Sequence, residues 1–219
     1  MFSGIISGLC TVKEVKNSSS GVSLGIKIEN RLLKGLEIGA SVAVNGVCLT
    51  VVKIEGNSDS TSNVYFDVVP ETLQRSNLSE IQNGSEVNIE RSLKFGDEVG
   101  GHLCSGHVDG KVSVVSMTEF GLGREIEFEV KSDLLKFILE KGYVALNGAS
   151  LTIANRTSNG FRVAFIPETL SKTNLGALVI GSNVNLEIDR STQAIIETVE
   201  RVLATTINPS HPLFINKEQ

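Results

Sequence analysis

The sequence contains no tryptophan, only two tyrosines, and fewer basic than acidic residues. Its 219 residues carry a net charge of −5, and the isoelectric point is about 5.3. Surfaces that bind nucleic acids need clustered lysine and arginine, often with aromatic side chains among them. The composition therefore predicts no nucleic-acid partner.

Long hydrophobic runs and a disulfide framework are also missing. No apolar run approaches the roughly 18 residues that a membrane helix needs, and no basic segment precedes an apolar stretch at the N-terminus. We therefore expect no membrane partner. The three cysteines, Cys10, Cys48 and Cys104, are odd in number and far apart, which favours a reducing cytoplasm. His102 and His107 lie near Cys104, but no second ligand cluster completes a zinc site, so no metal is expected.

What the chain does contain is an internal repeat. The segment VAVNGVCLTVV at 42–52 returns as VALNGASLTIA at 144–154, an offset of 102 residues. Three further pairs follow in the same order: SGIISGLCTV with SGHVDGKVSV, PETLQRSNL with PETLSKTNL, and GSEVNIE with GSNVNLE. Four collinear matches indicate a duplicated unit, which fits two domains of about 100 residues each.

Each copy consists of short β-rich segments separated by Gly, Asn and Ser, a pattern typical of an antiparallel barrel or sandwich. A few short helices interrupt this pattern. One is expected at NRLLKGL, and Pro70 is expected to open a helical turn in PETLQRSNL. Another is expected in SDLLKFILEKG, with Ser132 as its N-cap and its end at Gly142.

The segment STQAIIETVERVLATTI, residues 191–207, has no counterpart in the first copy. Ile196, Val199, Leu203 and Ile207 recur every three or four residues, which predicts an amphipathic helix. Its apolar stripe has two possible partners: the chain's own barrels, or copies of itself in an oligomer.

The repeated Leu-Thr segments place small polar side chains in matching positions. Residues i and i+2 of a strand share a face, so Cys48 and Thr50 point one way and Leu49 the other. The second copy repeats the arrangement with Ser150, Leu151 and Thr152. Such groups can form hydrogen bonds with the edge of a flat heteroaromatic ligand, but a polar outer face over a leucine core explains the pattern as well. Likewise, the duplication itself can serve two similar ligands or simply build a larger fold.

Two further groups of residues are candidates for ligand binding. The doubled Pro-Glu-Thr sequence supplies carboxylates and hydroxyls that can bind sugar hydroxyls, or it can serve only to open a helix. The junction KFGDEVGGHLCSGHVDG contains Gly100, Gly101 and Gly106, which permit positive φ and close approach of a ligand. It also contains His102, which is either an acid/base group or a structural histidine.

Taken together, these motifs resemble riboflavin synthase of the α-chain type. The resemblance rests on MFSGII, NGVCLTV, GGHLCSGH, NGASLTI, the doubled PETL and ETVERVL, in the family's order over residues 1–206. It implies an all-β fold of two tandem six-stranded antiparallel Greek-key barrels with a C-terminal α-helix that assembles a homotrimer. The implied divisions are lumazine-binding barrels at 1–97 and 98–190, an oligomerisation helix at 191–207 and a flexible tail at 208–219.

The family reaction is a dismutation of two molecules of 6,7-dimethyl-8-ribityllumazine. One donates a four-carbon unit to the other, giving riboflavin and 5-amino-6-ribitylaminouracil without a cofactor or a metal. The resemblance implies that the first barrel of one subunit and the second barrel of its neighbour hold the two substrates face to face. The alternative is a non-catalytic antenna or carrier for a lumazine or flavin. Both copies keep the Leu-Thr and Pro-Glu-Thr motifs, which favours the enzyme.

The resemblance also implies roles for individual residues. His102 is the acid/base candidate, Cys48 and Ser150 distinguish the donor and acceptor barrels, and Phe2 belongs to an N-terminal segment at the site. The residues implied to bind substrate are Gly4, Ile5, Ile6, Cys48, Leu49, Thr50, Asp67, Val68, Val69, Pro70, Glu71, Thr72, Gly101, His102, Leu103, Lys141, Asn147, Ser150, Leu151, Thr152, Ile166, Pro167, Glu168 and Thr169.

Two positions depart from the family pattern, because Ser3 replaces a threonine and Asn147 an aspartate. An amide cannot accept a proton as a carboxylate can. If that aspartate is a base in the family, His102 or bound water has to take its place here.

Overall fold

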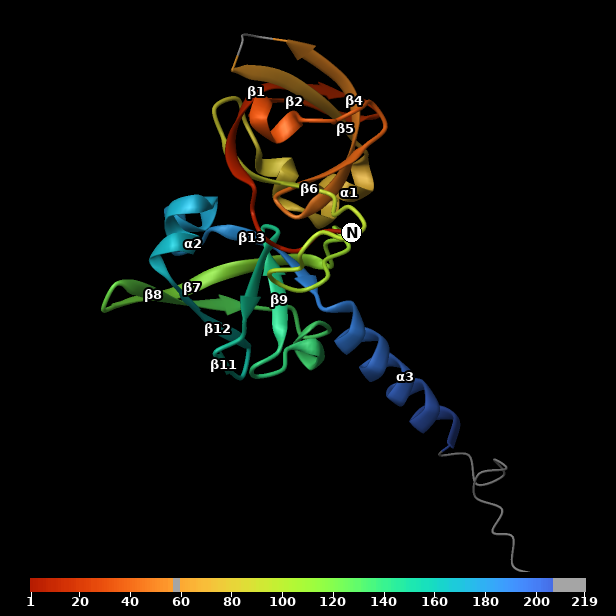
Figure 1. The fold of residues 1–219 in the computed structure, drawn as a ribbon. Helices are drawn as coiled ribbons and strands as arrows, with labels where there is room; N and C mark the ends of the chain where they lie inside the picture. Colours follow the sequence, from red (N-terminus) through yellow and green to blue (C-terminus); the bar gives the residue numbers. More distant parts are fainter. Residues whose placement is uncertain (57–59, 207–219) are drawn as a thin grey trace, which may run out of the picture.

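The computed structural model describes residues 1–56 and 60–206, which form a closed β-barrel, a second barrel-like sheet and a long helix (Figure 1). The first barrel contains β1 (Gly8–Ser18), β2 (Gly21–Glu29), β3 (Ser41–Val44), β4 (Val47–Gly56), β5 (Thr61–Val68) and β6 (Glu86–Arg91). These strands pair antiparallel and close in the order β1-β2-β5-β4-β3-β6. The predicted six-stranded barrel is therefore confirmed in the first copy.

The second copy repeats this architecture with one strand interrupted. Its strands are β7 (Gly110–Phe120), β8 (Gly123–Glu129), β9 (Tyr143–Leu146), β10 (Ala149–Thr152), β11 (Asn155–Arg156), β12 (Gly160–Phe165) and β13 (Asn183–Ile188). They form a sheet in the order β10-β9-β13-β7-β8-β12-β11. In the repeat, β10 and β11 correspond to the two ends of β4, and the break falls where β4 has a bulge between Val51 and Lys53.

Alternating side chains fill a separate core in each barrel. In β5 the inward positions include Val64 and Phe66, and in β12 they include Phe161 and Phe165, all of them inaccessible to solvent. Because successive strand residues face opposite sides, the intervening residues form the outer surface. Burying each such side chain contributes about 1.5–3 kcal/mol.

Short helical segments connect the strands, and one differs from the prediction. Pro70 opens α1 (Pro70–Arg75) as expected, α2 (Pro167–Lys172) repeats it, and NRLLKGL contains the 3-10 turn η1 (Asn30–Leu33). The helix predicted from Ser132 to Gly142 is wrong in extent, since only the 3-10 turn η3 (Leu135–Phe137) forms and its N-cap is Leu134. Phe137 and Ile138 are buried in the second core, and the chain turns there instead of continuing a helix.

The helix α3 (Arg190–Thr206) leads away from the second barrel (Figure 1). Ile196 packs against the second core, and Lys136 pairs with Glu200 at 2.5 Å. Further along, Val199 and Leu203 are 51% and 56% exposed. The helix thus contacts its own barrel through Ile196 and Glu200, while Val199 and Leu203 of its apolar stripe face outward.

Two parts of the C-terminal prediction lie outside the described residues. They are Ile207, the last residue of the predicted apolar stripe, and the predicted flexible tail at 208–219. No helix formed by residues 1–56 and 60–206 is long and apolar enough to cross a membrane.

Asparagine side chains join the two barrels. Asn147 Oδ1 accepts hydrogen bonds from Asn77 Nδ2 at 3.0 Å and from the Asn185 amide at 2.9 Å. The other copy mirrors this, because Asn45 Oδ1 accepts from Asn174 Nδ2 and from a backbone amide, both at 2.9 Å. We call the pseudo-symmetric set the asparagine network; its members are Asn45, Asn77, Asn88, Asn147, Asn174 and Asn185.

The first residues of each repeat cross over to the other barrel. The carbonyl of Gly4 accepts a hydrogen bond from the Ser150 amide, and the carbonyl of Gly106 accepts one from the Cys48 amide, both at 2.8 Å. A Cβ atom on Gly4 would lie 2.5 Å from that of Ser150, and one on Gly106 would lie 2.5 Å from that of Cys48. Both glycines have positive φ, so the crossover requires glycine at both places.

Candidate functional site

The repeated Leu-Thr strands turn their polar side chains away from the cores. Leu49 in β4 belongs to the first core, while Cys48 is half-buried and Thr50 is exposed. β10 repeats this arrangement with Leu151, Ser150 and Thr152. Any ligand bound by these polar groups therefore lies on the outer surface of a barrel.

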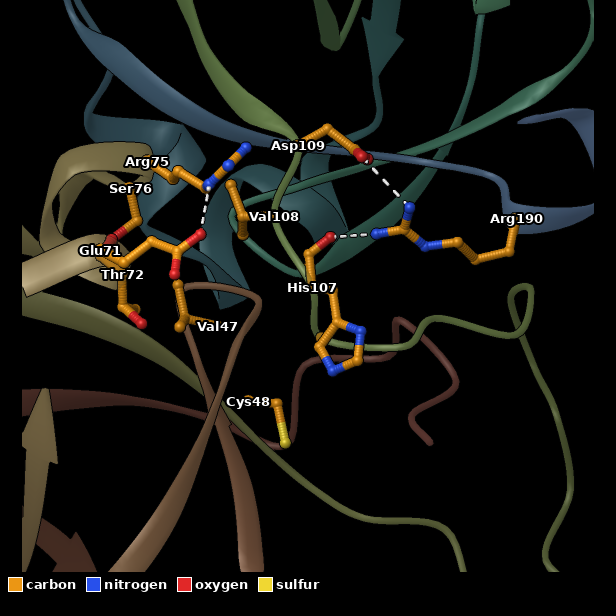
Figure 2. Close-up of a pocket in the computed structure, with 11 residues that line it drawn as sticks. Val47, Cys48, Glu71, Thr72, Arg75, Ser76, His107, Val108, Asp109 and Arg190 are labelled. Carbon is orange, nitrogen blue, oxygen red and sulfur yellow. Dashed lines mark hydrogen bonds and ion pairs between the residues drawn. The ribbon is translucent and has the colours of Figure 1, made fainter. Parts of the chain in front are cut away.

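On the first barrel, Cys48 opens into a cavity of about 600 Å³, a volume typical of small-molecule sites. β4, α1, the crossover segment before β7 and the start of α3 all contribute to its walls (Figure 2). The lining residues are Val47, Cys48, Glu71, Thr72, Arg75, Ser76, Gly106, His107, Val108, Asp109 and Arg190. The structure thus brings three predicted residues together: Cys48, Glu71 and Thr72.

The charged side chains that line this cavity are paired with one another. Glu71 pairs with Arg75 at 3.3 Å, while Arg190 pairs with Asp109 at 3.1 Å and donates to the His107 carbonyl (Figure 2). Arg190 therefore fixes the segment that carries His107 to the first turn of α3. With its charges paired, the cavity offers hydrogen-bonding groups without a large net charge.

Other predicted residues of the first copy lie apart from Cys48. Asp67 and Val69 line a different cavity of about 260 Å³ beside the turn between β1 and β2. Pro70 is exposed at the start of α1. The side chain of Val68 is buried in the first core, as is that of Leu49, so contact with a ligand through these two residues has to use backbone atoms.

On the second barrel, the polar centre consists of His102 and Ser150. His102 Nδ1 lies 2.6 Å from Ser150 Oγ, and the imidazole stacks on the Tyr143 ring at 5.3 Å between centroids. Burial lowers the pKa of His102 below its ordinary value, although the negative charge of Asp189 opposes this. The ring is therefore held neutral, the form in which a histidine can accept a proton.

The crossover segments are held by buried carboxylates. Glu90 accepts hydrogen bonds from the Ser3 amide and hydroxyl at 2.6 and 2.7 Å, and Glu187 accepts the equivalent pair from Ser105 at 2.5 and 2.7 Å. Burial raises the pKa of Glu90, against the effect of the hydrogen bonds from Ser3. These clamps place the crossover segments beside the two candidate half-sites.

The glycines of the junction serve packing as well. Gly106 has the expected positive φ of 81°, but Gly100 and Gly101 do not. A Cβ atom on Gly101 would lie 2.4 Å from the Ser3 carbonyl oxygen and 2.6 Å from the Ser150 Cβ. Gly101 therefore lets the junction pass directly over Ser150.

The remaining predicted residues surround the second barrel. Lys141 has a φ of 64°, in the position where the first copy has Gly39, and its Nζ donates to the Ala154 carbonyl at 3.3 Å. Such a strained conformation in a non-glycine residue is frequent at functional sites. Leu151 and Ile6 pack on the second core. The residues with exposed or half-buried side chains are Ile5, Leu103, Ile166, Pro167, Glu168 and Thr169.

Two predicted residues are buried and make structural contacts. The side chain of Asn147 is 3% exposed, and its amide group is hydrogen-bonded to Asn77, Asn174 and Asn185 within the asparagine network, so its contact with substrate stays a prediction. Phe2 is 1% exposed and packs with Ala43, Ala145 and Cys104 between the barrels. Its ring has no polar atom, and the structure therefore gives it a packing role.

Sequence reasoning missed His107 as a residue of the first half-site and Tyr143 as a residue of the second. His107 occupies the place of Ile5 in the repeat, and this polar substitution at an apolar position was the available signal. Tyr143 opposes Thr152 across β9 and β10, a pairing that the repeat alone does not give.

Duplicated barrels with matching outward half-sites define a two-domain ligand-binding protein. The family model described as a lumazine binding domain matches residues 3–92 and 105–189. The riboflavin synthase of Escherichia coli (strain K12) is 44% identical over 209 residues, 95% of this chain and 96% of the relative, and that of Chlamydia pneumoniae is 42% identical over 94% and 98%. The chain belongs to the riboflavin synthase family.

Solved structures agree with this assignment. LumP in complex with 6,7-dimethyl-8-(1'-D-ribityl)lumazine has a TM-score of 0.77 at 28% identity, covering 87% of this chain and all of that chain. LumP in complex with riboflavin has a TM-score of 0.78 at 30% identity and the same coverage.

Proposed function

We propose that this protein is a riboflavin synthase that converts two molecules of 6,7-dimethyl-8-ribityllumazine into riboflavin and 5-amino-6-ribitylaminouracil. The four-carbon unit leaves one substrate and joins the other, so the atoms of the two products equal those of the two substrates. The reaction needs no external oxidant or reductant. The observation that carries the proposal is that one chain, 44% identical to a riboflavin synthase, presents matching outward polar side chains on both copies of a duplicated unit.

In this proposal each barrel binds one lumazine. Cys48, Thr72 and Glu71 contact the ligand on the first barrel, and Ser150 and Thr152 contact the ligand on the second. His102 exchanges protons with the reacting atoms. Holding the two rings in register supplies much of the rate acceleration, because correct orientation of two reactants can lower a barrier by about 7–11 kcal/mol.

The complete site forms between subunits. Within one chain, the space between the barrels is taken by the asparagine network and by the paired backbones of Phe2 and Cys104, so two ring systems cannot stack there. The exposed stripe of α3, with Val199 and Leu203, joins copies into a homotrimer. The first barrel of one subunit then faces the second barrel of its neighbour. The divisions 1–97 and 98–190 for the barrels belong to the same proposal, as does a cytoplasmic location, which suits three free cysteines.

The first test is to incubate the purified protein with 6,7-dimethyl-8-ribityllumazine alone and to follow riboflavin absorbance. We expect riboflavin without any additive and a slower reaction for His102→Gln. Tight binding of the lumazine with no turnover would contradict the proposal and indicate a carrier or antenna.

The location of the site between subunits is tested by complementation. Cys48→Phe and Ser150→Phe each place a bulky ring in one half-site. Co-expression of the two variants creates interfaces in which both half-sites are intact, so activity should return in the mixed oligomer. If the site lay within one chain, the mixture would remain as inactive as the single variants.

A further inference from the structure

We propose that Cys104 is a positioning residue that fixes the tautomer of His102, so that the unprotonated Nδ1 faces the hydroxyl of Ser150. This inference rests on the proposed function, since His102 is its acid/base group. It assigns a second role to a cysteine that also packs with Phe2 between the barrels. Three contacts surround the buried imidazole of His102.

The thiol of Cys104 contacts two atoms of His102. Cys104 Sγ lies 3.6 Å from the His102 carbonyl oxygen and 3.6 Å from His102 Nε2. Cys104 is 3% exposed, and burial raises the pKa of its thiol, so the sulfur keeps its single proton. A carbonyl oxygen can only accept, so the contact with it uses the S–H.

The contact at Nε2 sets the tautomer of the His102 ring. We assign the single S–H to the carbonyl, and the contact between sulfur and Nε2 then runs the other way, with Nε2–H donating to Sγ. A neutral imidazole carries one proton, so Nδ1 is then an acceptor. The lowered pKa of His102 is consistent with a neutral ring.

The hydroxyl of Ser150 contacts the other ring nitrogen of His102. Its Oγ lies 2.6 Å from Nδ1, and with Nδ1 unprotonated the hydroxyl donates to the ring. This is the arrangement in which a base draws the proton from a hydroxyl. The Tyr143 ring, stacked at an angle of 13°, holds the plane of the imidazole. Cys104 thus selects which nitrogen is available, and Tyr143 holds the plane.

The primary test reads the tautomer directly. Nitrogen-15 NMR of histidine-labelled full-length protein distinguishes a protonated from an unprotonated ring nitrogen. We expect Nε2–H and a bare Nδ1 for His102 in the wild type, and a shift toward the other tautomer in Cys104→Ala. A wild-type ring protonated at Nδ1 would overturn the inference, and this result does not depend on whether the protein turns over lumazine.

The kinetic arm uses matched variants. General acid–base catalysis contributes roughly 10²–10⁴-fold to rates, so Cys104→Ala should lose about 10-fold or more in kcat with little change in KM. Cys104→Ser keeps one donor and one acceptor and should restore most of both readouts. Cys10→Ala removes another buried cysteine, one that lies in the first core, and serves as the control. Unchanged tautomer and unchanged kcat in Cys104→Ala would refute the role; if that variant fails to fold, Cys104→Ser and the wild-type spectrum still decide.

Discussion

Replacing Asn147 with alanine should destabilise the protein strongly without any loss of core volume. The substitution removes the hydrogen bonds of Asn147 to Asn77, Asn185 and Asn174 at 3.0, 2.9 and 3.1 Å. Asn77 Nδ2 retains a contact with the Asn183 carbonyl at 3.3 Å, but the other two partners lose theirs. Each buried group left unsatisfied costs about 1–3 kcal/mol. Alanine also has to adopt the φ of 44°, at a cost of about 1–2 kcal/mol.

The expected loss is therefore about 3–8 kcal/mol, a large part of the 5–15 kcal/mol that is typical of folded proteins. Urea unfolding at fixed protein concentration measures it. Asn45→Ala should cost a similar amount, because Asn45 has equivalent bonds and a φ of 47°. Asn63→Ala is the control, because the Oδ1 of Asn63 has no hydrogen-bond partner within the described part of the chain. A loss below about 1 kcal/mol for Asn147→Ala would refute the account of the network.

Three further predictions concern the cysteines, His102 and α3. Iodoacetamide should modify Cys48 before the other two cysteines, because Cys48 is half-exposed, Cys10 and Cys104 are buried, and burial raises the pKa of Cys10 to about 11. Bound lumazine should slow the modification of Cys48. Mass spectrometry that shows Cys104 modified first would contradict this prediction. Burial lowers the pKa of His102 below 6.5, so the contribution of His102 to stability should be fully present above pH 6.5 and should decline as the pH falls. Unfolding midpoints measured from pH 7.5 to 5 should show this decline in the wild type and not in His102→Gln. Leu203→Glu places a charge in the apolar stripe of α3 that we propose joins the subunits, so sedimentation should show monomers. A trimer that survives the substitution would show that α3 does not form the interface.

The strands and the outward direction of the polar side chains could be predicted from the sequence because they follow from local patterns. Those patterns fitted a barrel or a sandwich equally, and the two barrels were implied by the family resemblance. Alternation with period two identifies the strands, and the positions of Cys48 and Thr50 relative to Leu49 follow from the same rule. The repeat then transfers the result to the second copy.

What could not be predicted depends on contacts between the copies. The asparagine network and the crossover at Gly4 and Gly106 join residues far apart in the chain, and no local period records such pairings. The helix expected from Ser132 failed for a related reason. Its apolar residues do have helical spacing, but burying Phe137 and Ile138 in the second core overrides that preference.

The crossover has a consequence for the order in which the molecule matures. Residues 1–6 leave the ribosome long before Ser150, yet the amide that pairs with the Gly4 carbonyl belongs to Ser150. The first barrel likewise waits for Gly106 to cover Cys48. Neither half can complete its own surface before part of the other half has been synthesised, and pairings of such high sequence separation form slowly. We therefore expect the crossovers to form late in folding and the two barrels to unfold together.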